Sequence, residues 1–534
     1  MSLGLGLCET PAVSEEPSTR VPTWHRLLGS WWLLAVVVLA VYLASPVRNA
    51  TEHDPAFTPL TADSLVHGRG VALDSFGAKR LIGHPVVLTD EALDPGFVVT
   101  AVGADGWSEL RAAVDDPDVD VRDYFPWPAA VLAVPGVVVT DAVAALAGGD
   151  DSHELIAEHR FSFVHTASAS IVVLGAALAL RAAALVVLGG SPDRRRLLAN
   201  ATALVFAFGT SAYSTAGRAL WQHTPSLLLL SLAMWCAVRV QPAFCVSLTS
   251  HSDVGDTQNA EGRVDPWVVG LAAALTGAAI VRPTNLGVAL VLLAWVLVRR
   301  RGQWVPTLAS VLVGGVVVSG AFVLVSQALL GRWLPEYYSA GRLRFGEWIP
   351  EAVAANVVSP SRGLLIASPF LLLAIPGTWI VWRHRERDHR ALVVALWAGI
   401  AVVTASVSAF PQWWAGHSFG PRFMTETVPL MFVLALPAWD AVFAADRLRA
   451  GAPRRSRSVA AVVAVTVLAV WSIGFHASGS VAGVTGCWNL YPDDIDSDPS
   501  RVWSVTDSQV LEPLHRVLDA DRRAAQDEAC IRTR

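Results

Sequence analysis

Long apolar stretches recur along most of the chain and alternate with short polar segments. A helix needs about 20 mostly apolar residues to cross the hydrocarbon core of a bilayer. The pattern therefore predicts an all-α polytopic membrane protein with about 11 transmembrane helices. The predicted spans are residues 28–47, 166–189, 197–214, 219–239, 266–282, 284–299, 305–330, 363–383, 390–410, 424–446 and 457–476.

Two larger polar regions interrupt this pattern. The first, residues 48–165, contains the β-like runs Pro85–Leu88 and Phe97–Val102, which predict a mixed α/β loop. Its apolar stretch 126–146 is broken by prolines and an aspartate, which favours two short helices at the membrane surface over a further span. The second region is a tail, residues 477–534. The predicted organisation is a terminal segment 1–27, a transmembrane domain 28–476 that includes the loop, and this tail.

Charge gives the predicted orientation. The chain of 534 residues is 53% hydrophobic and 16% charged, with a net charge of −5, which excludes nucleic-acid binding through a basic face. Arginines cluster in short loops at 194–196, 299–301, 383–390 and 447–457. Short basic loops remain cytoplasmic. A multi-pass plasma-membrane protein is therefore predicted, with a cytoplasmic N-terminus and with the loop 48–165 and the C-terminus outside.

Four arginines depart from this distribution, because each lies at the predicted outer end of a span: Arg218, Arg282, Arg362 and Arg422. An arginine near the membrane interior usually faces a cavity and a partner. Guanidinium groups bind the paired oxygens of a phosphate well, so the cluster suggests a phosphate or pyrophosphate site. The alternative is that each arginine reaches the lipid headgroups or caps a neighbouring loop.

Other candidate site residues lie at the same predicted face. Asp54 follows the first span and is the candidate general base, with Glu52 and Asp63 as further carboxylates; solvated surface acids are the alternative. His223 is either a phosphate or proton-relay group or a hydrogen-bonded interfacial histidine. Tyr124, Trp413 and Trp414 are either substrate platforms or interfacial aromatics.

The chain contains none of the usual nucleotide or zinc motifs: GxxxxGK[ST], GxGxxG after a strand, CxxC or HExxH. No cofactor is therefore predicted with certainty, and no metal ligands are assigned. The acidic strings at 116–120 and 494–498 leave a divalent cation possible. Cys487 and Cys530 both fall in the tail, where an oxidising compartment permits a disulfide between them.

Several of these segments resemble the GT-C superfamily of membrane glycosyltransferases, in particular the branch of protein-O-mannosyltransferases and aminoarabinose transferases with its actinobacterial relatives. The similarity covers residues from about 30 to 510. The motif after the first helix departs from the family pattern, which is closer to Gly-Asp-x-x-x-Tyr, because Pro55 follows Asp54 here. The segments that carry the resemblance are Glu52-His53-Asp54, Tyr124-Phe125-Pro126-Trp127, Trp221-Gln222-His223, Arg282-Pro283-Thr284-Asn285, Ser359-Pro360-Ser361-Arg362-Gly363 and Gly420-Pro421-Arg422.

The resemblance implies an inverting glycosyltransferase that moves a sugar from a polyprenyl phosphate to an envelope glycan, glycolipid or protein outside the membrane. The acid after the first helix would be the base, and arginines would stabilise the leaving phosphate. Two alternatives remain: a transporter or flippase of a lipid-linked precursor, and a non-catalytic envelope-assembly protein. A transporter more often shows internal repeats and broken helices at mid-membrane.

Overall fold

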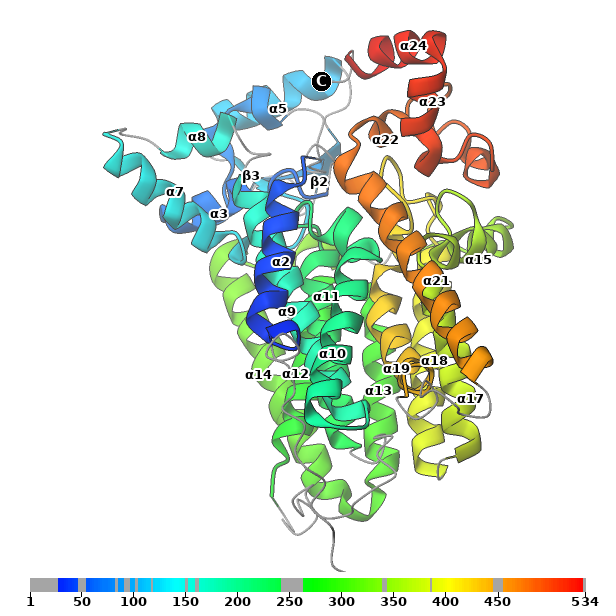
Figure 1. Ribbon diagram of the computed structural model, residues 1–534. Coiled ribbons are helices and arrows are strands. Elements are labelled where there is room, and N and C mark those ends of the chain that lie inside the picture. Colours follow the sequence, from blue (N-terminus) through cyan, green and yellow to red (C-terminus); the bar gives the residue numbers. More distant parts are fainter. Residues whose placement is uncertain are drawn as a thin grey trace, which may run out of the picture.

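The computed structural model in Figure 1 is a helical bundle with two smaller regions at one end. It describes residues 27–46, 54–81, 85–90, 97–100, 104–116, 119–148, 152–158, 163–241, 263–338, 343–384, 387–444 and 455–531. Glu52 and the loop 242–262 lie outside these ranges.

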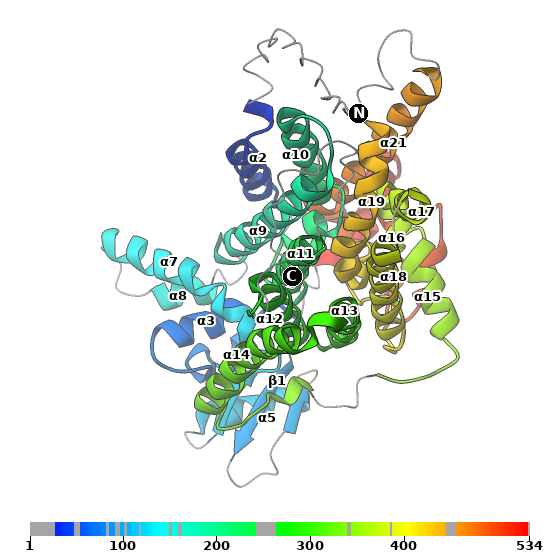
Figure 2. The same cartoon turned by 90° about the horizontal axis from the view of Figure 1, so that it is seen from below.

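The bundle is built from apolar helices of different lengths, and each of the predicted spans overlaps one of them. The helices are α2 (Trp31–Ala44), α9 (Phe163–Val187), α10 (Pro192–Phe208), α11 (His223–Val240), α12 (Pro266–Val281), α13 (Leu286–Arg299), α14 (Trp304–Leu330), α17 (Ala374–His384), α18 (Arg387–Ser408), α19 (Val428–Val442) and α21 (Arg455–Val481). Figure 2 shows α11 between α9 and α12, and α11 packs against both.

Six helical stretches among the described residues are long and apolar enough to cross a membrane: Phe163–Val187, His223–Val240, Arg301–Leu330, His389–Ser408, Arg422–Val442 and Val459–Val481. Shorter apolar helices, including α2, α12 and α13, lie beside them. The described part of the chain is therefore mainly helical, and its long apolar helices are consistent with an all-α membrane protein. Some predicted spans are divided because proline and polar residues interrupt the backbone hydrogen bonds: 363–383 becomes α16 (Leu364–Ala367), η10 (Pro369–Leu373) and α17.

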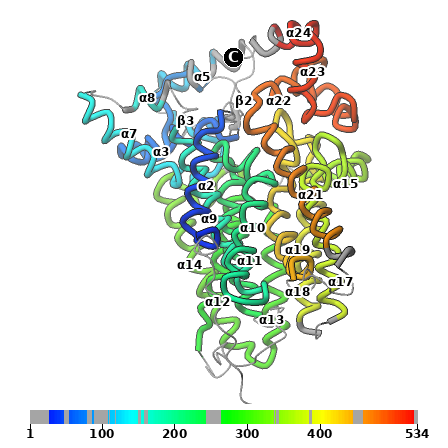
Figure 3. The backbone as a smooth tube through the Cα atoms, viewed as in Figure 1, coloured from blue at the N-terminus to red at the C-terminus, as the bar shows by residue number. Residues whose placement is uncertain are grey.

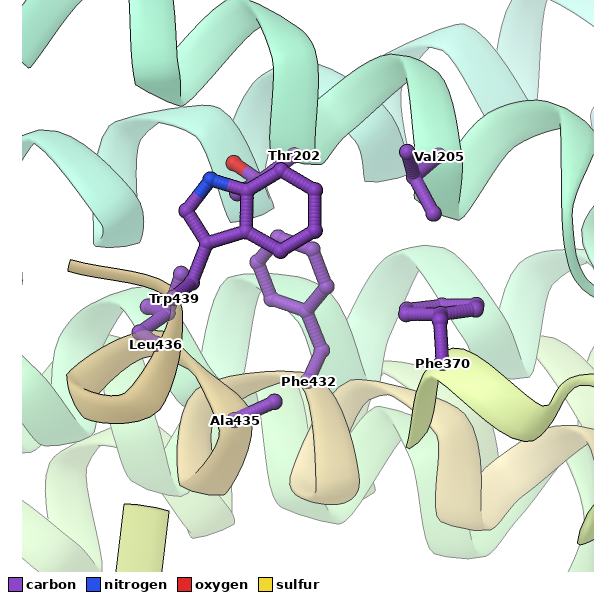
Figure 4. A pocket seen from close by; sticks show the side chains of 7 residues that line it. All are labelled: Thr202, Val205, Phe370, Phe432, Ala435, Leu436 and Trp439. Atoms are coloured by element: carbon purple, nitrogen blue, oxygen red, sulfur yellow. The ribbon is translucent and has the colours of Figure 1, made fainter. Parts of the chain in front are cut away.

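Local sequence explains several helix ends. Asp265 caps α12, since its carboxylate accepts hydrogen bonds from the backbone N–H groups of Trp267 (2.8 Å) and Val268 (3.4 Å). Gly331 ends α14 with a φ of 67°, a left-handed conformation that suits glycine. Trp439 and Phe432 of α19 pack with Phe370 around a small apolar cavity of about 10 Å³ (Figure 4), so the bundle interior is well filled there.

The first loop is a mixed α/β unit, as the sequence predicts. Strands β1 (Pro85–Asp90), β2 (Phe97–Thr100) and β3 (Val119–Asp123) form an antiparallel sheet in the order β2-β1-β3. The third strand was missed because its alternating aspartates resemble a solvated acidic loop. The helices are α3 (Thr58–Val66), α4 (Ala78–Leu81), α5 (Ala104–Asp115), α6 (Pro128–Val131), α7 (Val134–Leu146) and α8 (Ser152–Glu158), with η2 (Asp74–Phe76). The predicted pair within 126–146 is α6 and α7.

The C-terminal region lies at the same end of the bundle as the first-loop unit (Figures 1 and 3). It consists of α22 (Val484–Cys487), η12 (Pro499–Trp503), η13 (Gln509–Leu511), α23 (Glu512–Leu518) and α24 (Ala520–Ile531). Cys487 is disulfide-bonded, while the side chain of Cys530 is outside the described part. The remaining short elements are η3 (Ala212–Ala216), η6 (Pro283–Asn285), η7 (Arg301–Gln303), η8 (Glu336–Tyr338), α15 (Ile349–Val358) and η11 (Arg422–Thr427).

Candidate functional site

A cavity of about 480 Å³ opens where the bundle meets the first-loop unit and the C-terminal region. Segments that are far apart in the sequence supply its wall, because helix ends and loops from the whole chain meet here. The lining residues are Asp54, Phe125, Gln222, Arg282, Thr284, Tyr337, Phe410, Gln412, Ala415, Gly416, His417, Arg422, Phe423 and Asp496. Aromatic rings alternate with charged and amide groups, a composition typical of a ligand site.

Asp54 and Arg422 form an ion pair in this wall. Asp54 begins the turn before α3, and Arg422 begins η11, more than 300 residues later; one guanidinium nitrogen contacts Oδ2 of Asp54. The guanidinium also lies 4.1 Å from the centre of the Trp221 ring, which fixes its plane. Arg422 is only 8% exposed, and its Nε donates to Nε2 of His223 (3.4 Å), so Asp54, His223 and the cavity are its main polar surroundings.

Arg282, His223 and Glu426 form a buried chain of hydrogen bonds beside this pair. An Arg282 guanidinium nitrogen lies 2.8 Å from Nε2 of His223, and Nδ1 of His223 lies 2.9 Å from Oε1 of Glu426. A guanidinium only donates, so Nε2 must accept, and the proton of a neutral His223 is on Nδ1, which donates to Glu426. Arg282 Nε also lies 3.4 Å from Glu426 Oε1. His223 therefore orients Arg282 and does not line the cavity.

The local sequence explains how Arg282 reaches the cavity. Pro283 cannot continue the hydrogen bonding of α12, so the chain turns at Arg282 and re-enters the bundle as η6 and α13. Nδ2 of Asn285 donates to the carbonyl of Ala278 (3.1 Å) at the end of α12, and to Oγ of Ser226 (2.7 Å). This break between two helices directs the guanidinium of Arg282 toward the cavity, with Nε 3.2 Å from Thr284 Oγ1.

Asp123, at the end of β3, is a second carboxylate near Asp54. Burial, with a smaller contribution from the negative charge of Asp54, raises the pKa of Asp123 to about 8, although a hydrogen bond from the backbone N–H of Phe125 opposes the shift. Asp123 is thus protonated at neutral pH beside an ionised pair. The next residue, Tyr124, packs against Phe125 and Tyr337, with ring centroids 5.4 and 5.8 Å away, and so supports two residues of the cavity wall.

The end of the cavity nearest the C-terminal region has different chemistry. His417 Nε2 lies 2.9 Å from Oδ1 of Asp494 and 3.8 Å from Oδ2 of Asp496. Burial acts to raise the pKa of Asp494, but the N–H of Asp496 and the positive charges of His417 and Arg501 outweigh it and hold this pKa below its usual value. His417, Asp494 and Asp496 have the composition and spacing of a possible cation site.

Two further described groups have side chains close enough to hold a cation: Asp63, His67 and Asp141 in the first-loop unit, and Asp507, Glu512 and His515 in the tail. Asp63, a further carboxylate singled out in the sequence, is fully buried and pairs with Arg69 (2.5 Å) and His153 (2.7 Å). It is therefore a structural ion-pair residue at a distance from the cavity wall. Of the acidic string 116–120, Asp120 pairs with Arg122 on β3.

The other two boundary arginines do not line the cavity. Arg218 is fully buried, donates to the carbonyl of Tyr42 (2.9 Å) at the end of α2, and lies over the Tyr42 ring. Arg362 donates to the carbonyls of Ser418 (2.6 Å) and Gly416 (3.2 Å). It also donates to the side-chain oxygens of Gln509 (2.5 Å) and Asn489 (2.8 Å), and so fixes the tail to the bundle.

The predicted aromatic platforms are also largely buried. Trp413 and Trp414 are 4% and 9% exposed, and they pack with Ala352 and Trp488 in a small core of their own. Nε1 of Trp414 donates to Oδ1 of Asp496 (2.7 Å). Both tryptophans lie behind the cavity wall, and Trp414 orients Asp496, a carboxylate of that wall.

Comparison of the chain with protein-family models, with curated proteins and with solved structures gives no match.

Several residues of the site were missed in the sequence. Glu426 carries a recognisable signal, since a carboxylate inside an apolar span usually has a functional or structural partner. Asp123 directly precedes the aromatic segment Tyr124-Phe125-Pro126-Trp127, but nothing in the sequence places it beside Asp54. Asp496 and His417 are separated in the sequence by α19, α21 and α22 and were not connected, because their contact depends on how the tail folds back over the bundle.

Proposed function

We propose that the protein is an inverting glycosyltransferase of GT-C type, which uses a polyprenyl-phosphate sugar on the outer face of the plasma membrane. One observation carries this proposal: a cavity at the loop-bearing end of a membrane bundle brings the carboxylate of Asp54 against Arg422, with Arg282 in the same wall. The arrangement combines a base with two phosphate-binding cations. The proposed acceptor is an envelope glycan, glycolipid or protein.

Arg282 and Arg422 are the proposed donor-phosphate ligands. Both guanidinium groups reach the cavity, and aromatic rings set their planes: Arg422 lies over Trp221, and Arg282 lies 5.6 Å from the Phe423 centroid. Fixed guanidinium donors suit the paired oxygens of a phosphate. Because His223 and Glu426 hold Arg282 from behind, its remaining donors can bind a ligand without reorganisation.

Asp54 is the proposed base. The carboxylate takes the proton of an acceptor hydroxyl while the new bond forms between that oxygen and the anomeric carbon. The bond between the anomeric carbon and the phosphate oxygen breaks at the same time, and the polyprenyl phosphate leaves with the negative charge, next to Arg282 and Arg422. The attack from the face opposite the leaving group inverts the anomeric configuration.

The ion pair between Asp54 and Arg422 implies that the donor phosphate binds before Asp54 acts as a base. While Arg422 contacts Oδ2 of Asp54, the guanidinium occupies the oxygen that would accept the proton of the acceptor hydroxyl. An incoming phosphate competes for the same guanidinium, so donor binding releases Asp54 toward the acceptor. The pair therefore couples donor occupancy to activation of the base.

The test is transfer by the purified full-length protein in lipid nanodiscs, with a panel of polyprenyl-phosphate sugars and analysis of the linkage formed. Asp54→Asn should reduce transfer by about 100-fold or more, since it removes a general base. Thermal unfolding should be nearly unchanged, and Asp115→Asn, an exposed aspartate of α5, is the matched control. Normal transfer by Asp54→Asn would reject the assignment. Movement of an intact lipid-linked sugar across the membrane, without transfer, would favour the flippase alternative.

A further inference from the structure

The two ends of the cavity carry different charged groups: two arginines, each paired with a carboxylate, at one end, and a histidine with two aspartates at the other. Arg282 and Arg422 form one end, whereas Asp496 and His417 line the other, with Asp494 directly behind His417. An anionic group is attracted to the arginines and repelled by the two aspartates. A single substrate phosphate therefore has one favoured position, and the aspartate end must accommodate something else.

The aspartate end is held in a fixed geometry. Trp414 Nε1 donates to Oδ1 of Asp496 (2.7 Å), which leaves Oδ2 of that carboxylate 3.8 Å from His417 Nε2, beyond a direct hydrogen bond. The His417 loop has left-handed backbone at Ala415 (φ 67°) and Gly416 (φ 57°). Arg362 holds the carbonyls on either side of His417, those of Gly416 and Ser418, and thus fixes this turn.

Polar side chains and rings continue the wall between the two ends. Gln222 and Gln412 offer amide donors and acceptors, and Phe125, Tyr337 and Phe410 offer ring surfaces. Carboxylate, imidazole and amide groups placed among aromatic faces match a sugar, whose hydroxyls need hydrogen-bond partners and whose C–H faces pack on rings. A purely apolar acceptor would displace water from these polar groups without replacing its hydrogen bonds, at a cost for each group.

We propose that His417 and Asp496 form an acceptor subsite for the hydroxyl groups of a neutral glycan, with the C-terminal region supplying its wall. This inference rests on the proposed function, because it names the acceptor class of the same cavity. Asp496 accepts hydrogen bonds from the glycan hydroxyls, and His417 is held by Asp494 so that its ring faces the same space. The reactive hydroxyl then points toward Asp54 at the other end.

The experiment measures direct binding of short neutral oligosaccharides of mannose, arabinose or glucose to the full-length protein in nanodiscs. Saturation-transfer NMR reports the binding without any need for turnover. Asp496→Asn and His417→Ala should each weaken binding by about 10-fold, since each removes hydrogen bonds to a charged or polar partner. Asp115→Asn, an exposed aspartate of α5 that does not line the cavity, is the matched control and should bind the oligosaccharides as wild type does.

The outcomes separate this inference from the proposed function. Oligosaccharide binding that depends on His417 and Asp496, without transfer from any donor, would support the subsite and reject the transferase. Transfer to a protein or lipid acceptor, with no oligosaccharide binding, would reject the subsite alone. Binding that is equal in wild type and both variants would also overturn it. So would saturable Mn²⁺ binding at His417, Asp494 and Asp496 in a protein that binds none of the sugars.

Discussion

Arg422 and Arg362 occur in similar sequences, after a proline at the end of a predicted span, yet they lie in two different parts of the molecule. Arg422 faces a cavity and pairs with a carboxylate in the same wall. Arg362 is 1% exposed and donates to carbonyl and amide oxygens of the 416–418 turn and the tail. A ligand phosphate can replace a carboxylate partner, whereas backbone carbonyls around a buried guanidinium have no such substitute. The type of partner therefore distinguishes a binding arginine from a structural one.

The largest expected effect is on catalysis at the cavity. Arg422→Gln should lower transfer by roughly 100- to 1000-fold, the range seen when a charge-stabilising donor is removed from a transition state. Unfolding should change little, because Asp54 is 25% exposed and can be hydrated once its partner is lost. The measurement combines transfer rate with thermal unfolding of the same preparation. A large loss of stability with an unchanged transfer rate would show that Arg422 has a structural role like that of Arg362. The proposed difference between the two arginines would then be wrong.

The next effect is on stability at the tail. Arg362→Ala should lower the free energy of unfolding by about 2–4 kcal/mol, since it leaves several buried oxygens without donors and opens a void. The 416–418 turn and the tail would separate more readily, so limited proteolysis should cut the C-terminal region faster. Arg362→Lys is the informative second variant: it keeps the charge but cannot donate to four acceptors in the geometry of a guanidinium.

A proteolysis pattern identical to wild type in both Arg362 variants would contradict the anchoring role. The turn that Arg362 fixes also carries His417, so these variants should weaken neutral-glycan binding as well. They should do so without the selective loss of donor binding expected for Arg422→Gln.

Apolar periodicity predicted the helical bundle because burial in lipid requires long helices and leaves a strong pattern in the sequence. It did not predict helix length, since six of the described stretches are long and apolar enough to cross a membrane, where 11 spans were expected. Pro85–Leu88 and Phe97–Val102 likewise predicted strands correctly. The positions of the four boundary arginines correctly indicated that each is buried. They did not indicate that only two, Arg282 and Arg422, line the cavity, while the other two bind other parts of the protein. Partners such as Asp496 and Glu426 are set by contacts between distant segments, which local pattern does not encode.

The smallest expected effect concerns Asp123. It tests whether the charge of this buried carboxyl group changes donor binding at the arginine end of the cavity. Its pKa of about 8 means that it carries a proton at neutral pH and loses it above that value. Ionisation adds a negative charge near the donor phosphate, so KM for the donor should rise roughly fivefold above pH 8, as one charge interaction of about 1 kcal/mol predicts. Asp123→Asn should remove this rise, whereas Asp120→Asn, an exposed residue of the same strand, should keep it.

The same pKa shift fixes the sign of the stability change. The native state holds the Asp123 proton up to about pH 8, whereas an unfolded aspartate releases it near pH 4. Stability contributed by this group is thus complete below about pH 4 and falls as pH rises toward 8. Thermal unfolding of wild type should decline across that window relative to Asp123→Asn. A parallel decline in both proteins would show that Asp123 ionises normally, and the donor-KM profile of the variant would then match that of wild type.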